Sequence, residues 1–141
     1  MISTTPPNFS RYLVTLPDFA LYFVCALIML MLFLAIYTRL TPQREWRLIK
    51  DGNQAAAISL GGAMLGFAMP LGSAIMNSQS LIDMLVWGAV ALIVQALTFV
   101  AARFLFSGLP QRISRGETAA AIAVAALSLT VGLLNAASMT Y

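Results

Sequence analysis

Long apolar segments alternate with short polar ones along this chain, and four of them have the length of a membrane-spanning helix. They cover about residues 19–40, 54–76, 84–105 and 117–140. An α-helix rises about 1.5 Å per residue, so about 20 apolar residues cross the hydrocarbon core of a bilayer, which is roughly 30 Å thick. The pattern therefore predicts an all-α membrane protein with four transmembrane helices.

Two further amphipathic segments are too short to cross a membrane. Before Pro17, apolar residues recur three and four positions apart, which predicts a short helix in the membrane interface within residues 1–17. Residues 43–51 predict a second short helix on the membrane surface, with Trp46 and Ile49 on its buried side.

A ten-residue pattern occurs twice, 64 residues apart. Residues 49–58 and 113–122 align without a gap, and both copies read Ile-x-x-Gly-x-x-Ala-Ala-Ala-Ile. We interpret the chain as two tandem copies of a two-helix unit, residues 18–77 and 82–141. Each unit has an even number of spans, so the two units are expected to run parallel through the membrane.

The composition indicates a chain for which lipid is part of the solvent. Of its 141 residues, 60% are apolar and 9% are charged, against roughly 45–50% and about 25% in ordinary soluble domains. The net charge of +3 resides in short loops rather than on a folded polar face, so we expect no nucleic-acid partner. The single cysteine, Cys25, excludes a disulfide within the chain.

The basic residues gather in the first and third connections, residues 41–53 and 107–116. Positive residues mark the cytoplasmic side, so we expect both connections in the cytoplasm of a bacterium and both termini in the periplasm. Gly52 and Gly116 are the expected elbows, where each connection turns into the inner membrane. The residues expected to face the cytoplasm or the phosphates of anionic lipids are Arg39, Arg44, Trp46, Arg47, Lys50, Arg103, Arg112 and Arg115.

Residues that carry chemistry are scarce. The chain has no histidine, so it offers no Ser-His or Cys-His pair and no imidazole metal site. All five acids lie at predicted membrane boundaries, whereas a proton-coupled carrier needs a carboxylate within the membrane. We therefore predict a protein without enzymatic activity and without a metal or other cofactor.

Small and polar residues follow one face of each of the last three spans. Such faces let helix backbones approach closely in lipid, so we interpret them as packing interfaces. A narrow polar path for a solute or ion and a docking face for a partner helix are the alternatives. The residues assigned to packing or to the path are Ser59, Gly62, Gly66, Pro70, Ser73, Asn77, Gln95, Thr98, Ser128, Gly132 and Asn135.

Gln95 is the most informative of these residues, because an amide in hydrocarbon must meet another helix, another subunit or water. Shifting the small-residue face of the second span by 64 positions does not reproduce that of the fourth span. We therefore expect one face inside the bundle and the other against another subunit.

Several local strings are shared with one known family. They are Thr41-Pro42, Glu45-Trp46, Leu48-Ile49-Lys50, Leu65-Gly66, Pro70-Leu71 with Ser73, Trp87-Gly88, Gln95, and Asn135-Ala136-Ala137 with Met139-Thr140. On these strings the chain resembles the YjfL-like family of small bacterial inner-membrane proteins. The resemblance implies four spans, no established biochemical activity and, through the neighbours of these proteins in genomes, a link to envelope maintenance.

These observations together predict a non-enzymatic inner-membrane protein that acts in envelope integrity. Its expected partners are the lipid bilayer, further copies of itself and other membrane-stress or envelope proteins. The alternative is a channel or facilitator for a small solute or ion, in which Gln95, Ser128 and Asn135 would line the path.

Overall fold

A computed structural model describes residues 8–41 and 44–139 of the chain. Within these residues the chain is helical, in the order α1 (Phe9–Leu40), α2 (Glu45–Lys50), α3 (Gln54–Asn77), α4 (Leu81–Leu105), α5 (Leu109–Ser114) and α6 (Thr118–Ser138). The helices α1, α3, α4 and α6 are long and apolar enough to cross a membrane. The predicted all-α class and its four spans are confirmed.

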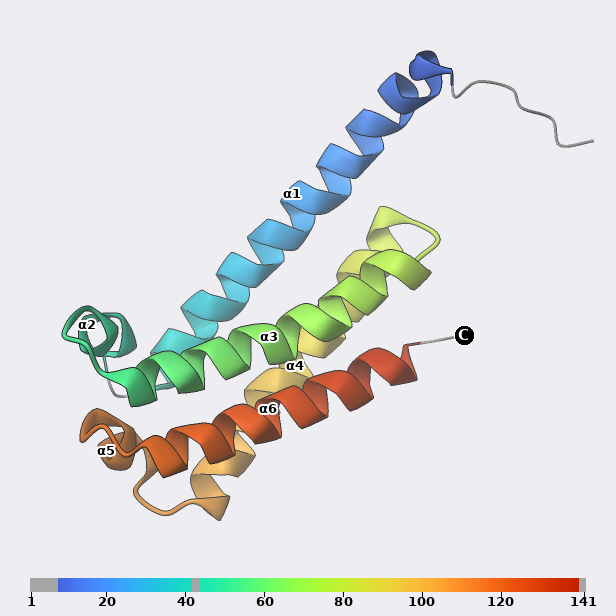
Figure 1. Ribbon diagram of the computed structural model, residues 1–141. Helices are drawn as coiled ribbons and strands as arrows, with labels where there is room; N and C mark the ends of the chain where they lie inside the picture. The colour runs from blue at the N-terminus through green and yellow to red at the C-terminus, as the bar shows by residue number, and fades with distance from the viewer. Residues whose placement is uncertain (1–7, 42–43, 140–141) are drawn as a thin grey trace, which may run out of the picture.

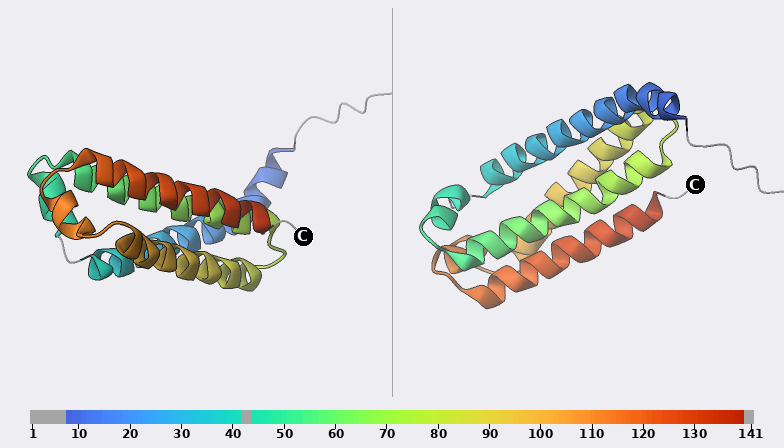
Figure 2. Two further views of the ribbon diagram at one scale, coloured as in Figure 1. Left: turned by 90° about the horizontal axis from the view of Figure 1, so that it is seen from below. Right: turned by 45° about the horizontal axis from the view of Figure 1, so that its top comes forward.

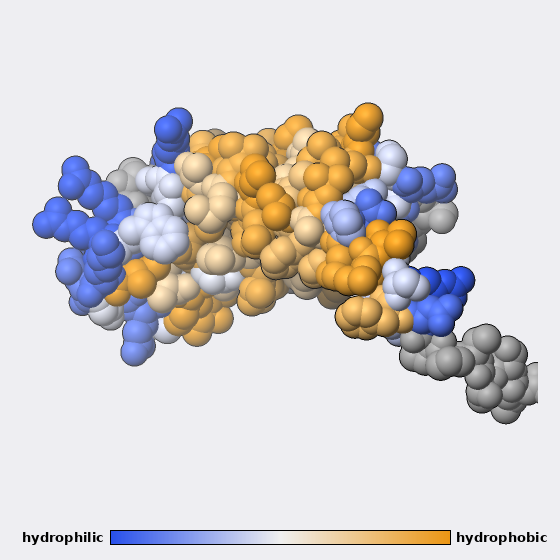
Figure 3. Space-filling view, turned by 90° about the horizontal axis from the view of Figure 1, so that it is seen from above, coloured by the Kyte–Doolittle hydropathy of each residue, from blue (hydrophilic) through white to orange (hydrophobic). Residues whose placement is uncertain are grey.

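The four long helices form two layers (Figures 1 and 2). Helices α3 and α6 lie side by side and run in the same direction, both starting at the end of the molecule that carries α2 and α5. Helices α1 and α4 make the other layer and run the opposite way. Figure 3 shows a broad apolar band between two hydrophilic ends, as expected of a bundle that crosses a bilayer.

The first helix differs from the prediction at its start. Helix α1 continues through Pro17, so the expected end of a short interfacial helix at this proline is wrong. The proline ring removes the N–H that would bond to the Leu13 carbonyl, but no glycine follows to end the helix. Residues 1–7 of the expected interfacial segment lie outside the described residues.

The two elbows have the same backbone geometry. Gly52 and Gly116 adopt φ angles of 85° and 81°, which lie in the left-handed region that glycine enters without strain. A shift of 64 residues carries α2 onto α5, although the sequence predicted only the first of these surface helices. Its expected start at residue 43 lies outside the described residues, and the division of the chain into two units stays a prediction.

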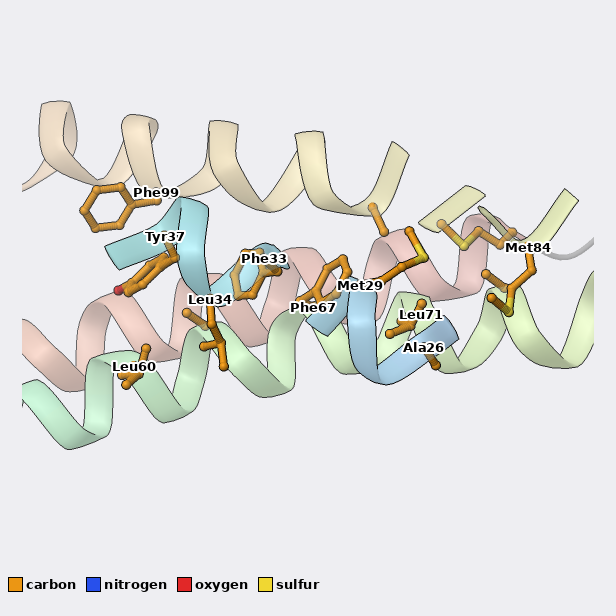
Figure 4. Close-up of a cluster of buried hydrophobic side chains, with 14 residues drawn as sticks. Ala26, Met29, Phe33, Leu34, Tyr37, Leu60, Phe67, Leu71, Met84 and Phe99 are labelled. Atoms are coloured by element: carbon orange, nitrogen blue, oxygen red, sulfur yellow. The ribbon is translucent and has the colours of Figure 1, made fainter. Parts of the chain in front are cut away.

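Aromatic and methionine side chains fill the space between α1, α3 and α4 (Figure 4). Phe33 stacks on Phe67 with ring centroids 4.7 Å apart, and Tyr37 meets the edge of Phe99 at 5.0 Å. A second cluster of mostly alanines packs beside α5 at the ends where α3 and α6 begin. This core holds the α3–α6 pair against the α1–α4 layer.

Candidate functional site at the α3–α6 seam

The closest helix contact joins α3 to α6, along a line that we call the seam. Gly62 lies against Ala125, and Gly66 lies against Ser128 and Gly132. A methyl group at Gly66 would be 2.5 Å from the Ser128 carbonyl oxygen. Only small residues allow the two backbones to approach this closely, and dispersion over such a contact is a main source of helix association in lipid.

Gln95 reaches the seam from α4 and is 2% exposed. Its Nε2 donates to the Gly66 carbonyl at 2.7 Å and to the Ser128 carbonyl at 3.0 Å. The amide nitrogen has two hydrogens, and each is directed to a different helix. The other helices of the same chain therefore satisfy the Gln95 amide nitrogen.

Pro70 explains why the Gly66 carbonyl takes this bond. In an α-helix that carbonyl would accept from the N–H of residue 70, but proline has none. Helix α3 nevertheless continues through Pro70, because Gln95 supplies the missing donor from outside the helix. Pro70 and Gln95 thus form one unit, although they lie 25 positions apart in the sequence.

Three further polar residues assigned to packing bond to the backbone, whereas Asn135 does not complete its bonds within the described part of the chain. The Ser73 hydroxyl donates across the seam to the Ala136 carbonyl at 2.8 Å. The hydroxyls of Ser59 and Thr98 donate within their own helices. The Asn135 Nδ2 atom is buried and has no partner among the described residues.

Most of the residues that we assigned to packing or to a polar path are buried. Asn77 and Asn135 are half-buried, and the buried ones are Ser59, Gly62, Gly66, Pro70, Ser73, Gln95, Thr98, Ser128 and Gly132. The small faces of α3 and α6 pack on each other, so the expectation that one of them faces another subunit is wrong. A 64-residue shift compares equivalent faces of the two helices, whereas the seam joins non-equivalent faces.

Glu45 is a buried acid that the sequence did not single out. It is 1% exposed and lies close to the side chain of Tyr37, which is also close to Ser59. Trp46, which we expected on the buried side of this surface helix, is instead 51% exposed. The six-residue helix α2 turns its carboxylate toward polar neighbours and leaves the indole outside, where tryptophan suits a membrane interface.

The basic residues of the connections are mostly on the surface. Arg39, Arg103 and Arg115 are exposed, and Arg44, Trp46, Arg47 and Lys50 line a shallow cavity of about 470 Å³ beside α2. Arg112 differs, because its Nε and Nη2 donate to both carboxylate oxygens of Glu117 at 2.7 and 2.9 Å. These hydrogen bonds lower the pKa of Glu117 below its usual value.

Asn53 connects the two elbows and was also missed from the sequence. Its Oδ1 accepts from the Ala56 N–H at 3.0 Å and so caps α3. Its Nδ2 donates to the carbonyls of Ile113 at 3.0 Å and Ser114 at 3.2 Å. An asparagine before a helix is a recognisable cap, but no local pattern indicates its second role as a bridge to α5.

Replacing Asn53 with alanine should lower the free energy of unfolding by about 1–2 kcal/mol, because the cap and the bridge are both lost. Asn53→Asp is the matched control: aspartate keeps the cap acceptor but lacks the donor to α5. We expect it to be intermediate in thermal unfolding of the purified protein. Equal stability of the aspartate variant and the wild type would show that the bridge adds nothing, and equal stability of the alanine variant would contradict the whole prediction.

Among the described residues, no group of three or more His, Cys, Asp or Glu side chains could hold a metal ion. The packing on both sides of Gln95 leaves its amide between two backbone carbonyls. What this arrangement can do chemically is to bind helices together.

Comparison with known proteins finds a family model and relatives that match most of the chain. The model of the Domain of Unknown Function DUF350 matches residues 11–139. The chain is 39% identical over 123 residues to the UPF0719 inner membrane protein YjfL of Escherichia coli (strain K12), covering 87% of this chain and 93% of that protein. It is 31% identical over 90 residues to the UPF0719 transmembrane protein YshE of Bacillus subtilis (strain 168), covering 64% and 67%. No solved structure matches the chain.

Proposed function

The chain belongs to the DUF350 family, and we propose that it acts as a non-enzymatic assembly component that supports envelope integrity. It is a multi-pass membrane protein, and its relative YjfL is an inner membrane protein. The protein would work as a homo-oligomer or in a complex with other envelope proteins.

The observation that carries this proposal is the pair of hydrogen bonds made by Gln95. A solute path needs polar groups that are free to replace the hydration of the solute. Here the amide nitrogen of Gln95 is occupied by backbone carbonyls, and a side chain added at Gly66 would meet Ser128. Two of the three residues that would have lined a channel, Gln95 and Ser128, thus bond to each other in the packed seam, which supports the assembly role over the channel.

The proposed orientation places α2 and α5 in the cytoplasm and both termini in the periplasm. Support comes from the seven basic residues at or near this end of the spans, against Arg11 at the other. Exposed Arg44, Arg47 and Lys50 would also hold anionic lipid headgroups, at about 1 kcal/mol per basic residue near a charged surface.

Native mass spectrometry of the wild-type protein in nanodiscs tests the assembly. We expect a mass of more than one chain, and a strain lacking the gene should become more sensitive to detergent until the wild-type gene is restored. A single-chain mass with no partner crosslinked in native membranes would overturn the proposal. Solute-selective flux in proteoliposomes that Gln95→Leu abolishes would instead support the channel.

A further inference from the structure

The outer side of α2 carries basic residues next to a tryptophan. Trp46, Arg47 and Lys50 fall within about 100° of the helix circumference, and all three are exposed. Arg44, the residue before the helix, is exposed as well. These four residues line the shallow cavity of about 470 Å³ beside α2, which we call the α2 cavity. Three cations around one cavity favour an anionic ligand.

The opposite side of α2 fixes this presentation. Leu48 and Ile49 pack against the apolar clusters of the core, and Glu45 lies close to the side chain of Tyr37. Glu45 also borders the α2 cavity, but only 1% of its surface is exposed. The charges that a ligand meets in the cavity are therefore those of the three cations.

These cations are available to a ligand. None of Arg44, Arg47 and Lys50 forms an ion pair within the described part of the chain. Arg112 of α5, by contrast, donates to both carboxylate oxygens of Glu117. The positive charge beside α2 is thus left for a partner outside the chain.

The second half of the chain does not repeat this arrangement. The 64-residue shift that carries α2 onto α5 replaces the three cations and the tryptophan with the uncharged Gly108, Pro110, Gln111 and Ser114. The backbone of the two elbows is alike, so the difference lies in the side chains. A site built on these four side chains is confined to the first half of the chain.

The α2 cavity opens at the boundary of the apolar band. Thr38, in the last turns of the span α1, forms one of its walls. Ala35, Met31 and Ile28 precede Thr38 by three, seven and ten positions and so follow the same side of α1. All three are exposed. A basic cavity that continues into an apolar strip suits a phosphate with an acyl chain attached, whereas a soluble anion has no use for the strip.

We propose that the α2 cavity binds one anionic phospholipid per chain, with the headgroup phosphate among the three cations and an acyl chain along the Thr38 side of α1. The cations donate charge-assisted hydrogen bonds to the phosphate oxygens. A headgroup that carries its own ammonium group gains less from them. The inference deepens, and rests on, the lipid contact proposed for these residues, and it adds a single site in the first half of the chain.

The two tryptophans of the chain allow a test in lipid vesicles. Trp46 lines the α2 cavity, whereas Trp87 lies near the start of α4, at the other end of the spans. Trp87→Phe leaves Trp46 as the reporter, and Trp46→Phe leaves Trp87 as its control. Each variant is placed in phosphatidylcholine vesicles with a small share of phosphatidylglycerol or phosphatidylethanolamine that carries bromine, a contact quencher of indole fluorescence, on its acyl chains.

Brominated phosphatidylglycerol should quench Trp46 to a plateau at a lower share of lipid than brominated phosphatidylethanolamine does. The two lipids should quench Trp87 equally. Equal quenching of Trp46 by the two lipids would overturn the inference. Inorganic phosphate added at constant ionic strength should leave the quenching of Trp46 unchanged; displacement of the lipid would indicate a site for a soluble anion and would overturn the inference too.

Arg47→Gln and Arg103→Gln separate a built site from general attraction of anionic lipid. Both arginines are exposed near the same end of the spans, and each substitution removes one charge. Arg47→Gln should lower the affinity for phosphatidylglycerol reported by Trp46 by about fivefold, and Arg103→Gln should leave it unchanged. Equal losses would show that only the net charge matters, against a single site.

The outcome is distinguishable from that of the proposed assembly. The vesicles hold the same lipids in both leaflets, so the quenching does not depend on the orientation of the chain. A single-chain mass for the wild type in nanodiscs would contradict the assembly and leave this inference in place. Loss of the lipid preference at Trp46 in a protein with an oligomeric mass would contradict this inference alone.

Discussion

Replacing Gln95 with leucine should lower the free energy of unfolding by about 1–3 kcal/mol, the cost of a buried carbonyl left without a donor. The lost bonds are those to Gly66 and Ser128. The Ser128 carbonyl still accepts within α6, but the Gly66 carbonyl has no N–H at Pro70 to replace the amide. Unfolding of the purified protein in detergent, followed by tryptophan fluorescence, measures the loss.

The matched control uses the same proline. Pro70→Ala restores an N–H four residues after Gly66, so the Gln95→Leu change should cost less in that background by about 1 kcal/mol or more. Coupling of this size would show that the two residues act as one unit. If the two substitutions were additive, the Gln95 bond would have no connection with the proline.

Placing a methyl group at Gly66 should also be strongly destabilising, by about 1–3 kcal/mol. The new atom would lie 2.5 Å from the Ser128 carbonyl oxygen and 2.9 Å from the Gln95 amide nitrogen. The clash is with backbone on the α6 side, which cannot move without opening the seam. Thermal unfolding of Gly66→Ala measures the effect.

Gly61→Ala is the control for this substitution, since both glycines lie in the same helix. Its added methyl meets nothing within 4 Å of the chain, and alanine is the better helix former by about 1 kcal/mol. We expect Gly61→Ala to be as stable as the wild type or more so. Equal losses in both variants would show that helix flexibility, rather than close packing, explains the glycines.

The sequence predicted the elements whose signal is local. The length of each apolar run indicated four spans, and the isolated amide of Gln95 indicated a contact with another helix. The repeated glycine indicated elbows at Gly52 and Gly116, and the structure gives both residues a positive φ. The same 64-residue shift could also have predicted α5, because it carries Glu45–Lys50 onto Leu109–Ser114.

What the sequence could not show depends on which helix faces lie opposite each other. Pro70 and Gln95 meet only because α4 covers the seam, and nothing near either residue indicates the other. The seam joins non-equivalent faces of the repeat, so a comparison of equivalent positions in α3 and α6 was misleading. Glu45 is buried in place of Trp46, its neighbour about 100° around the six-residue helix α2, and no local pattern indicates which side of so short a helix packs.

Labelling of a cysteine at Ser128 in membranes tests the central claim that the polar faces are closed packing interfaces. Ser128 is 4% exposed at the middle of the seam, whereas Ser114 is exposed at the end of α5. With Cys25 replaced by alanine, a charged methanethiosulfonate reagent added to opened membrane fragments, where it reaches both faces, should label Ser114→Cys and leave Ser128→Cys unmodified. Labelling of Ser128→Cys at a rate near that of Ser114→Cys would reveal a water-filled path and contradict the account.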